Sequence, residues 1–136
     1  MANVPLKIRE LVRIRAAFRC EYCLVPEQYH PLPRFHVEHI FGKKHGGNTE
    51  LTNLALACPE CNRKKGTDIG SRKSPKGKFI RLFNPRTDIW RNHFELNWAI
   101  IRPKTNIGEI TIKMLGFNDN FRIVFREYLM LIRVYP

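Results

Sequence analysis

Four cysteines stand in two pairs of identical spacing, Cys20/Cys23 and Cys58/Cys61, and the chain has no other cysteine. Residues 24–57, 34 in all, separate the two pairs. Two Cys-x-x-Cys pairs supply four soft thiolates, the ligand set of a closed tetrahedral zinc site. We therefore predict that all four cysteines bind one structural Zn²⁺. An iron–sulfur cluster, a disulfide framework or a redox dithiol are the alternatives for the same residues.

A second set of residues that could take part in catalysis lies between and just after these pairs. Glu38 and His39 are adjacent in the segment 35–40, and Asn62 directly follows Cys61. An imidazole with an ordinary pKa near ~6.5 can accept a proton from water at neutral pH. A carboxylate and an amide oxygen suit hard Mg²⁺ or Mn²⁺. Strand alternation would point Glu38 and His39 to opposite faces, so we expect a twist or a bulge at this strand end.

These motifs resemble those of the HNH endonucleases, whose ββα-metal fold carries the active site on two strands and a helix. The resemblance covers roughly residues 20–66. It rests on five segments: Cys20-Glu21-Tyr22-Cys23, Val37-Glu38-His39-Ile40, His45-Gly46-Gly47, Asn53-Leu54, and Cys58-Pro59-Glu60-Cys61-Asn62 with Lys65 after it. Asn62 stands where the pattern that names the family has its third residue, a histidine.

The resemblance implies an activity and assigns roles. His39 would be the general base, and Glu38 and Asn62 would bind a catalytic Mg²⁺ or Mn²⁺. Asn53 would hold the loop and so orient His39. The implied reaction is one-metal hydrolysis of DNA, in which His39 activates a water for in-line attack and cleavage leaves a 5′-phosphate.

The charge of the chain favours a polyanionic partner, and we predict DNA. The sequence has 24 Lys+Arg against 12 Asp+Glu, a net charge of +12. Residues 58–91 hold 10 basic and 3 acidic residues, so they contribute +7 of this excess. The candidate nucleic-acid contacts are Arg63, Lys64, Lys65, Arg72 and Lys73.

The length and the hydrophobic periodicity predict an α+β fold in one domain over residues 1–136, with an N-terminal helix, a strand–loop–strand–helix core and a C-terminal helical extension. The resemblance implies that this core is a small zinc-stapled ββα-metal unit. The expected parts are an N-terminal helix over 5–19, the zinc-stapled core over 20–66, a basic loop over 67–81 and the extension over 82–136. Within the core we expect strands at 35–40 and 54–57 and a helix at 60–65. The extension shows helical stripes over 107–115 and 121–132 and a weaker strand pair at 94–97 and 99–101.

Composition excludes several classes of protein. A hydrophobic content of 43% is too high for a disordered chain. The N-terminus lacks the apolar stretch of a signal peptide, and no apolar run approaches ~18 residues, so we expect a soluble, cytoplasmic protein without membrane contact. A homodimer is compatible with the sequence, but no residue pattern specifies one.

Two other functions compete with a nuclease. A zinc-stapled DNA-binding module without catalysis would use the cysteines and the basic segment but leave Glu38, His39 and Asn62 without a role. A zinc-stapled protein-interaction domain would leave the net charge of +12 unexplained as well.

Overall fold

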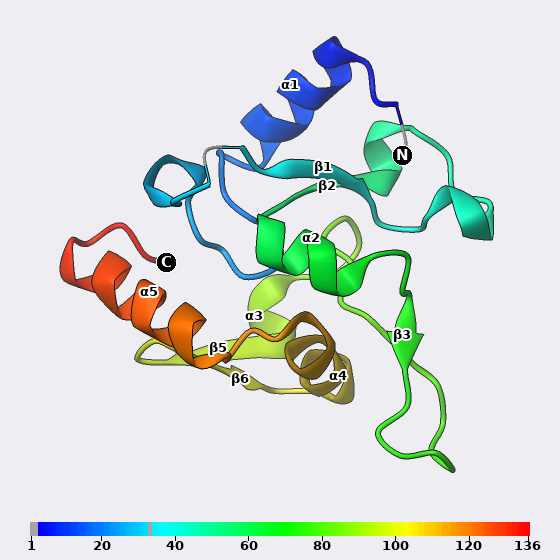
Figure 1. Ribbon diagram of the computed structural model, residues 1–136. Helices are drawn as coiled ribbons and strands as arrows, with labels where there is room; N and C mark the ends of the chain where they lie inside the picture. Colours follow the sequence, from blue (N-terminus) through cyan, green and yellow to red (C-terminus); the bar gives the residue numbers. More distant parts are fainter. Residues whose placement is uncertain (1–2, 33) are drawn as a thin grey trace.

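The computed structural model describes residues 3–32 and 34–136 and has the predicted α+β class. Figure 1 shows helix α1 above a two-stranded sheet, helix α2 below it, and the C-terminal elements stacked beneath α2. The elements in chain order are α1 Leu6–Arg15, β1 His36–His39, β2 Leu54–Ala57, α2 Pro59–Lys65, β3 Gly70–Ser71, β4 Ile80–Arg81, α3 Trp90–His93, β5 Phe94–Asn97, β6 Ile100–Pro103, α4 Asn106–Leu115 and α5 Asn120–Leu131. Short 3₁₀ turns occur at Glu27–Tyr29, Lys43–His45 and Leu51–Asn53.

Helix α1 ends earlier than predicted, at Arg15 instead of residue 19. Ala17 and Phe18 take left-handed backbone conformations with φ of 53° and 57°, which an α-helix cannot continue through. The Arg15 guanidinium donates to Leu51 O at 2.8 Å and to Leu54 O at 2.6 Å. Helix α1 is therefore fastened to the beginning of β2.

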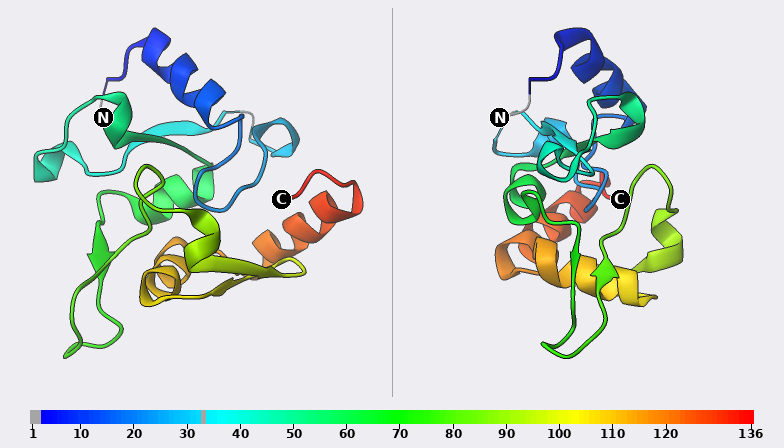
Figure 2. Two further views of the ribbon diagram at one scale, coloured as in Figure 1. Left: turned by 180° about the vertical axis from the view of Figure 1, so that it is seen from behind. Right: turned by 90° about the vertical axis from the view of Figure 1, so that its right-hand side faces the viewer.

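Strands β1 and β2 and helix α2 form the predicted ββα unit. The strands pair antiparallel from His36↔Ala57 to His39↔Leu54, and every residue of β2 is fully buried. Pro59 occupies the first turn of α2, where its missing N–H costs nothing, and Gly66 ends the helix with φ of +52°. Helices α1 and α2 both contact this strand pair, and the views show them on opposite sides of it (Figures 1 and 2).

The loop between β1 and β2 is closed by the Asn53 amide and by two glycines. Asn53 Nδ2 donates to Phe41 O at 2.9 Å and to Asn48 O at 2.7 Å, and Oδ1 accepts from Phe41 N at 2.9 Å. A Cβ at Gly47 would lie 1.7 Å from Phe41 O, so only glycine fits there. Gly46 has φ of +92°. The His-Gly-Gly segment and Asn53 thus hold one compact loop.

The segment predicted as a basic loop at 67–81 contains a hairpin, which corrects that interpretation. Strands β3 and β4 pair through Gly70↔Arg81 and Ser71↔Ile80. A Cβ at Gly70 would lie 2.3 Å from Ile80 O, so the pairing depends on this glycine. The two ladder pairs are too short to give a recognisable alternating pattern in the sequence. The hairpin projects from the body of the molecule (Figures 1 and 2).

The weakly predicted strand pair in the extension is present as β5 and β6, which pair antiparallel. The turn between them uses Trp98 with φ of +55°, and because a tryptophan is unusual at a left-handed position, no residue pattern indicated this turn. Helix α4 lies against β6 and α2 and begins where the Thr105 hydroxyl accepts a hydrogen bond from Gly108 N at 3.0 Å.

The extension is anchored onto the core at residues 20–66 by long side chains. Arg86 forms an ion pair with Glu21 and donates to Leu54 O at 3.2 Å. The Trp90 indole donates to Tyr22 O at 2.8 Å. Glu21 and Tyr22 lie between Cys20 and Cys23, so the first part of the extension contacts the first cysteine pair's turn.

Candidate active site and metal centre

The four cysteine sulfurs come together at one buried point. One ligand atom from each of Cys20, Cys23, Cys58 and Cys61 lies within 4.8 Å of all the others, and each residue is at most 1% exposed. Cys20 and Cys23 belong to the turn after α1, whereas Cys58 precedes α2 and Cys61 lies in its first turn. The cluster therefore joins the N-terminal segment to the ββα unit, as the spacing predicted.

The geometry of the cluster fits a zinc ion. Tetrahedral Zn–S bonds of ~2.3 Å place neighbouring sulfurs ~3.8 Å apart, and Cys23 Sγ lies 3.7 Å from Cys58 Sγ. In each pair the second cysteine N–H faces the first sulfur at 3.4 Å. All four cysteines are free of disulfides. Four buried thiolates this close repel one another, so a divalent cation is needed to keep them all ionised.

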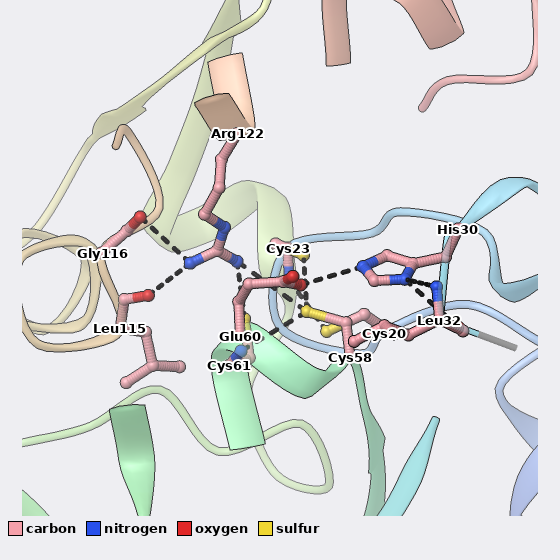
Figure 3. Close-up of polar contacts among 10 residues, drawn as sticks. All are labelled: Cys20, Cys23, His30, Leu32, Cys58, Glu60, Cys61, Leu115, Gly116 and Arg122. Carbon is pink, nitrogen blue, oxygen red and sulfur yellow. Dashed lines mark hydrogen bonds and ion pairs between the residues drawn. The ribbon is translucent and has the colours of Figure 1, made fainter. Parts of the chain in front are cut away.

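Two further ionic groups surround the sulfurs, and sequence reasoning missed both (Figure 3). Arg122 of α5 donates to Cys61 Sγ at 3.0 Å. His30 Nε2 lies 3.0 Å from Glu60 Oε1, and the His30 side chain is only 5% exposed. Burial, the largest single influence, lowers the pKa of His30, but the hydrogen bond to Glu60, the Glu60 charge, Leu32 O and the Cys23 thiolate together outweigh it and leave the pKa raised. Neither residue belongs to a motif, so only the packing could reveal them.

A separate hollow of about 420 Å³ brings together Glu38, His39 and Asn62, the three residues predicted for phosphodiester chemistry. We predicted a twist or a bulge at this strand end. The pairing of β1 with β2 is continuous from His36 to His39, so there is no bulge in β1, and the twist stays a prediction. All four residues of β1 border the hollow, although strand alternation points their side chains to opposite faces. Its lining is His36, Val37, Glu38, His39, Gly42, Lys43, Lys44, Asn62, Gly66 and Thr67.

His39 is half-buried at the rim of this hollow. Its Nε2 atom lies 3.0 Å from Thr49 Oγ1, which fixes the ring. Burial, with contributions from Lys43 and Lys65, lowers the pKa of His39 below its ordinary value. The imidazole is therefore neutral at neutral pH, the state that a general base requires.

Glu38 is buried and held from two sides. The Tyr22 hydroxyl donates to Oε1 at 2.5 Å, and Lys65 Nζ lies 3.2 Å from Oε2. Burial raises the pKa of Glu38, while Lys65 and Tyr22 oppose that rise. Tyr22 lies between Cys20 and Cys23, so its hydrogen bond connects the cysteine-bearing segment to the candidate active-site carboxylate.

The donor set in the hollow also fits a hard divalent cation. Glu38 Oε2 is buried and has no hydrogen-bond partner among residues 3–32 and 34–136, and Lys65 approaches it as an ion pair without hydrogen-bond alignment. Asn62, one turn into α2, borders the same hollow. A carboxylate oxygen with spare lone pairs and an amide oxygen are ligands that Mg²⁺ accepts, with water completing the shell.

The basic candidates for nucleic-acid contact divide into two groups. Arg63, Lys64, Arg72 and Lys73 are exposed. Lys65 is 2% exposed and donates to His39 O at 3.2 Å and Ile40 O at 3.0 Å, so its prediction as a DNA contact is wrong. The short helix α2 turns Lys65 toward β1, where it supports the main chain of the predicted base.

Residues 20–68 match the family model described as HNH endonuclease. The chain therefore carries an HNH-family domain, and the resemblance derived from its motifs is confirmed. The chain is also similar to the Septu protein PtuB of Bacillus thuringiensis, with 31% identity over 96 residues. That alignment covers 69% of this chain but 35% of PtuB, so the chain spans about a third of this relative's length.

No solved structure matches the chain significantly. Among the helices of residues 3–32 and 34–136, none has the length and apolar character needed to cross a membrane.

Proposed function

We propose that the chain is a metal-dependent DNA endonuclease that hydrolyses phosphodiester bonds with His39 as general base. The observation that carries this proposal is the hollow that gathers His39, Glu38 and Asn62 beside exposed Lys43 and Lys44. A neutral base, a pair of hard-metal ligands and flanking cations together suit phosphoryl transfer to water. The HNH-family match over residues 20–68 supports the same reaction class.

His39 would take the proton from the attacking water. In the tautomer whose Nε2–H donates to Thr49 Oγ1, the lone pair is on Nδ1, which is then free to accept that proton. Asn53 and Lys65 act on the same residue through the main chain. Asn53 closes the loop that follows β1, and Lys65 donates to His39 O. Both are positioning residues in this proposal.

Glu38 and Asn62 would hold the catalytic Mg²⁺ or Mn²⁺. When bound there, a divalent cation supplies positive charge to a phosphate oxygen and to the leaving 3′-oxygen. Tyr22 and Lys65 keep the Glu38 carboxylate in place, so its orientation is set before any substrate arrives. The reaction would leave a 5′-phosphate and a 3′-hydroxyl.

The hairpin of β3 and β4 would bind the phosphates of the DNA backbone. Arg63 on α2 and the hairpin residues Arg72, Lys73, Lys76 and Lys78 are exposed. Lys73 is partly engaged by Glu109 at 3.2 Å, so we expect Arg72, Lys76 and Lys78 to contribute more to phosphate binding. A zinc ion on the four cysteines would hold the fold, and we propose the cytoplasm as the reducing location that suits such thiolates.

The test is the incubation of the full chain with supercoiled plasmid in Mg²⁺ or Mn²⁺, with EDTA as the metal control. His39→Ala should lose all nicking. His93→Ala is the matched control, because His93 bonds to Thr105 outside the hollow, and it should retain activity. Plasmid binding in a gel shift with no cleavage in either metal would overturn the nuclease proposal in favour of a zinc-stapled DNA-binding module.

A further inference from the structure

Arg122 is a buried cation whose anionic partners are sulfurs. The residue is 4% exposed and lies in the first turn of α5. Its Nη2 atom lies 3.0 Å from Cys61 Sγ and 3.9 Å from Cys58 Sγ (Figure 3). Among the described residues no carboxylate forms an ion pair with Arg122. The cysteine cluster is therefore its counter-charge.

The rest of the guanidinium is fixed to the end of α4. Nη1 donates to Leu115 O at 2.5 Å and to Gly116 O at 3.0 Å, two carbonyls at the end of α4, and Gly116 O also accepts from Asp119 N at 3.2 Å. The guanidinium carbon also lies 5.8 Å from the centre of the Phe117 ring. The planar fork thus joins the end of α4, the start of α5 and the sulfur cluster, which a lysine could not do.

Electrostatics explain why a cation belongs at this place. Four thiolates around one Zn²⁺ carry a net charge of −2 (−4 + 2), and all of it is buried. A guanidinium at hydrogen-bond distance compensates part of that charge and withdraws electron density from the Cys61 sulfur. A thiolate that accepts such a bond is a weaker nucleophile toward electrophiles and oxidants.

We propose that Arg122 is the charge partner of the zinc–thiolate centre, through which α5 protects the thiolates and fastens the C-terminal segment to the metal site. Arg122 lies well outside the HNH-family match at residues 20–68. This role is independent of nuclease activity. Through Arg122, helix α5 would contribute to the stability of the metal centre.

The neighbouring Arg126 provides a matched control. It lies one turn later on α5 and is 0% exposed, yet its guanidinium bonds to Ala99 O at 2.7 Å and Asn118 Oδ1 at 3.0 Å and to no sulfur. Truncation of either arginine removes a buried, hydrogen-bonded cation from the same helix. Only truncation of Arg122 removes a hydrogen bond to a sulfur.

The experiment measures zinc loss from the full, zinc-loaded chain on reaction with N-ethylmaleimide, followed with a zinc-binding dye under conditions in which each variant stays folded. Arg122→Met should release zinc at least about tenfold faster than the parent chain, the range found when outer-shell partners are removed. The zinc release rate of Arg126→Met should stay within about twofold of the parent chain, even if its melting temperature falls by as much as that of Arg122→Met. Equal release rates for the two variants would overturn the proposal.

A second measurement covers the case in which Arg122→Met does not fold. Arg122→Lys keeps the charge but cannot reach both the α4 carbonyls and the sulfur. In the Co²⁺-loaded chain, its thiolate-to-cobalt charge-transfer band should move to longer wavelength, because a sulfur that loses a hydrogen bond donates electrons more readily. Arg126→Lys should leave the band in place. An unchanged band in Arg122→Lys would refute the contact.

Discussion

Replacement of Tyr22 by phenylalanine tests the link between the cysteine cluster and the candidate active site. The change removes one hydroxyl, which donates to Glu38 Oε1 at 2.5 Å from a side chain that is 0% exposed. A hydrogen bond to a charged group contributes ~1.5–3 kcal/mol. We therefore expect a loss of about 2 kcal/mol in the free energy of unfolding. At ~2.1 cal/mol/K per residue, this corresponds to roughly 7 °C in melting temperature for 136 residues.

The loss in unfolding free energy for Tyr22→Phe should depend on pH, because Glu38 changes its protonation state. Burial raises the pKa of Glu38 in the fold above its unfolded value, so its contribution to stability is greatest at low pH and is lost as pH rises through the folded pKa. Tyr22 opposes that rise by stabilising the ionised carboxylate. Tyr22→Phe should therefore cost more at about pH 8 than at about pH 5.5, where more of Glu38 is protonated.

Tyr135→Phe is the matched control for this measurement. Tyr135 is 6% exposed and donates to Cys23 O, a neutral acceptor, at 2.8 Å. We expect it to cost about 1 kcal/mol at both pH values. Any effect of pH on the cysteine cluster would appear in both variants. The assay is denaturant unfolding of both variants at both pH values. A loss in unfolding free energy for Tyr22→Phe that is independent of pH, or no larger than that of Tyr135→Phe, would refute the reasoning.

Three further outcomes are expected. Because burial, Lys43 and Lys65 lower the pKa of His39, the cleavage rate at ~pH 6.5 should stay above half of its plateau value and should fall about tenfold per unit only below the lowered pKa; a rate already halved at pH 6.5 would contradict this. Replacing Arg72 and Lys76 by glutamine should reduce the slope of log K against log[salt] for DNA by about 2, and an unchanged slope would exclude the hairpin from the interface. Cys58→Ser should lose zinc and much of its thermal stability, whereas His39→Ala should keep both, so similar melting losses would argue against separate structural and chemical roles.

The local signals in the sequence were sufficient for the core. Cysteine spacing located the metal cluster, because two turns of the form Cys-x-x-Cys each bring their sulfurs together locally. Pro59 and Gly66 marked the ends of α2 for reasons of backbone geometry alone. The short pairing of β3 with β4 and the turn at Trp98 were not predicted, since neither has the periodicity or the turn residues that indicate a strand or a hairpin.

The sequence by itself determined which residues have the chemistry: four thiolates, a histidine, a carboxylate and an amide in a recognisable order. Only the tertiary structure decided how they are supported. Tyr22 reaches Glu38 across 16 positions of the chain, and Arg122 reaches Cys61 across 61. Lys65, which looked like one of several surface cations, is buried against Glu38. Such contacts depend on how helices and strands pack, because no periodicity encodes a partner so far away along the chain.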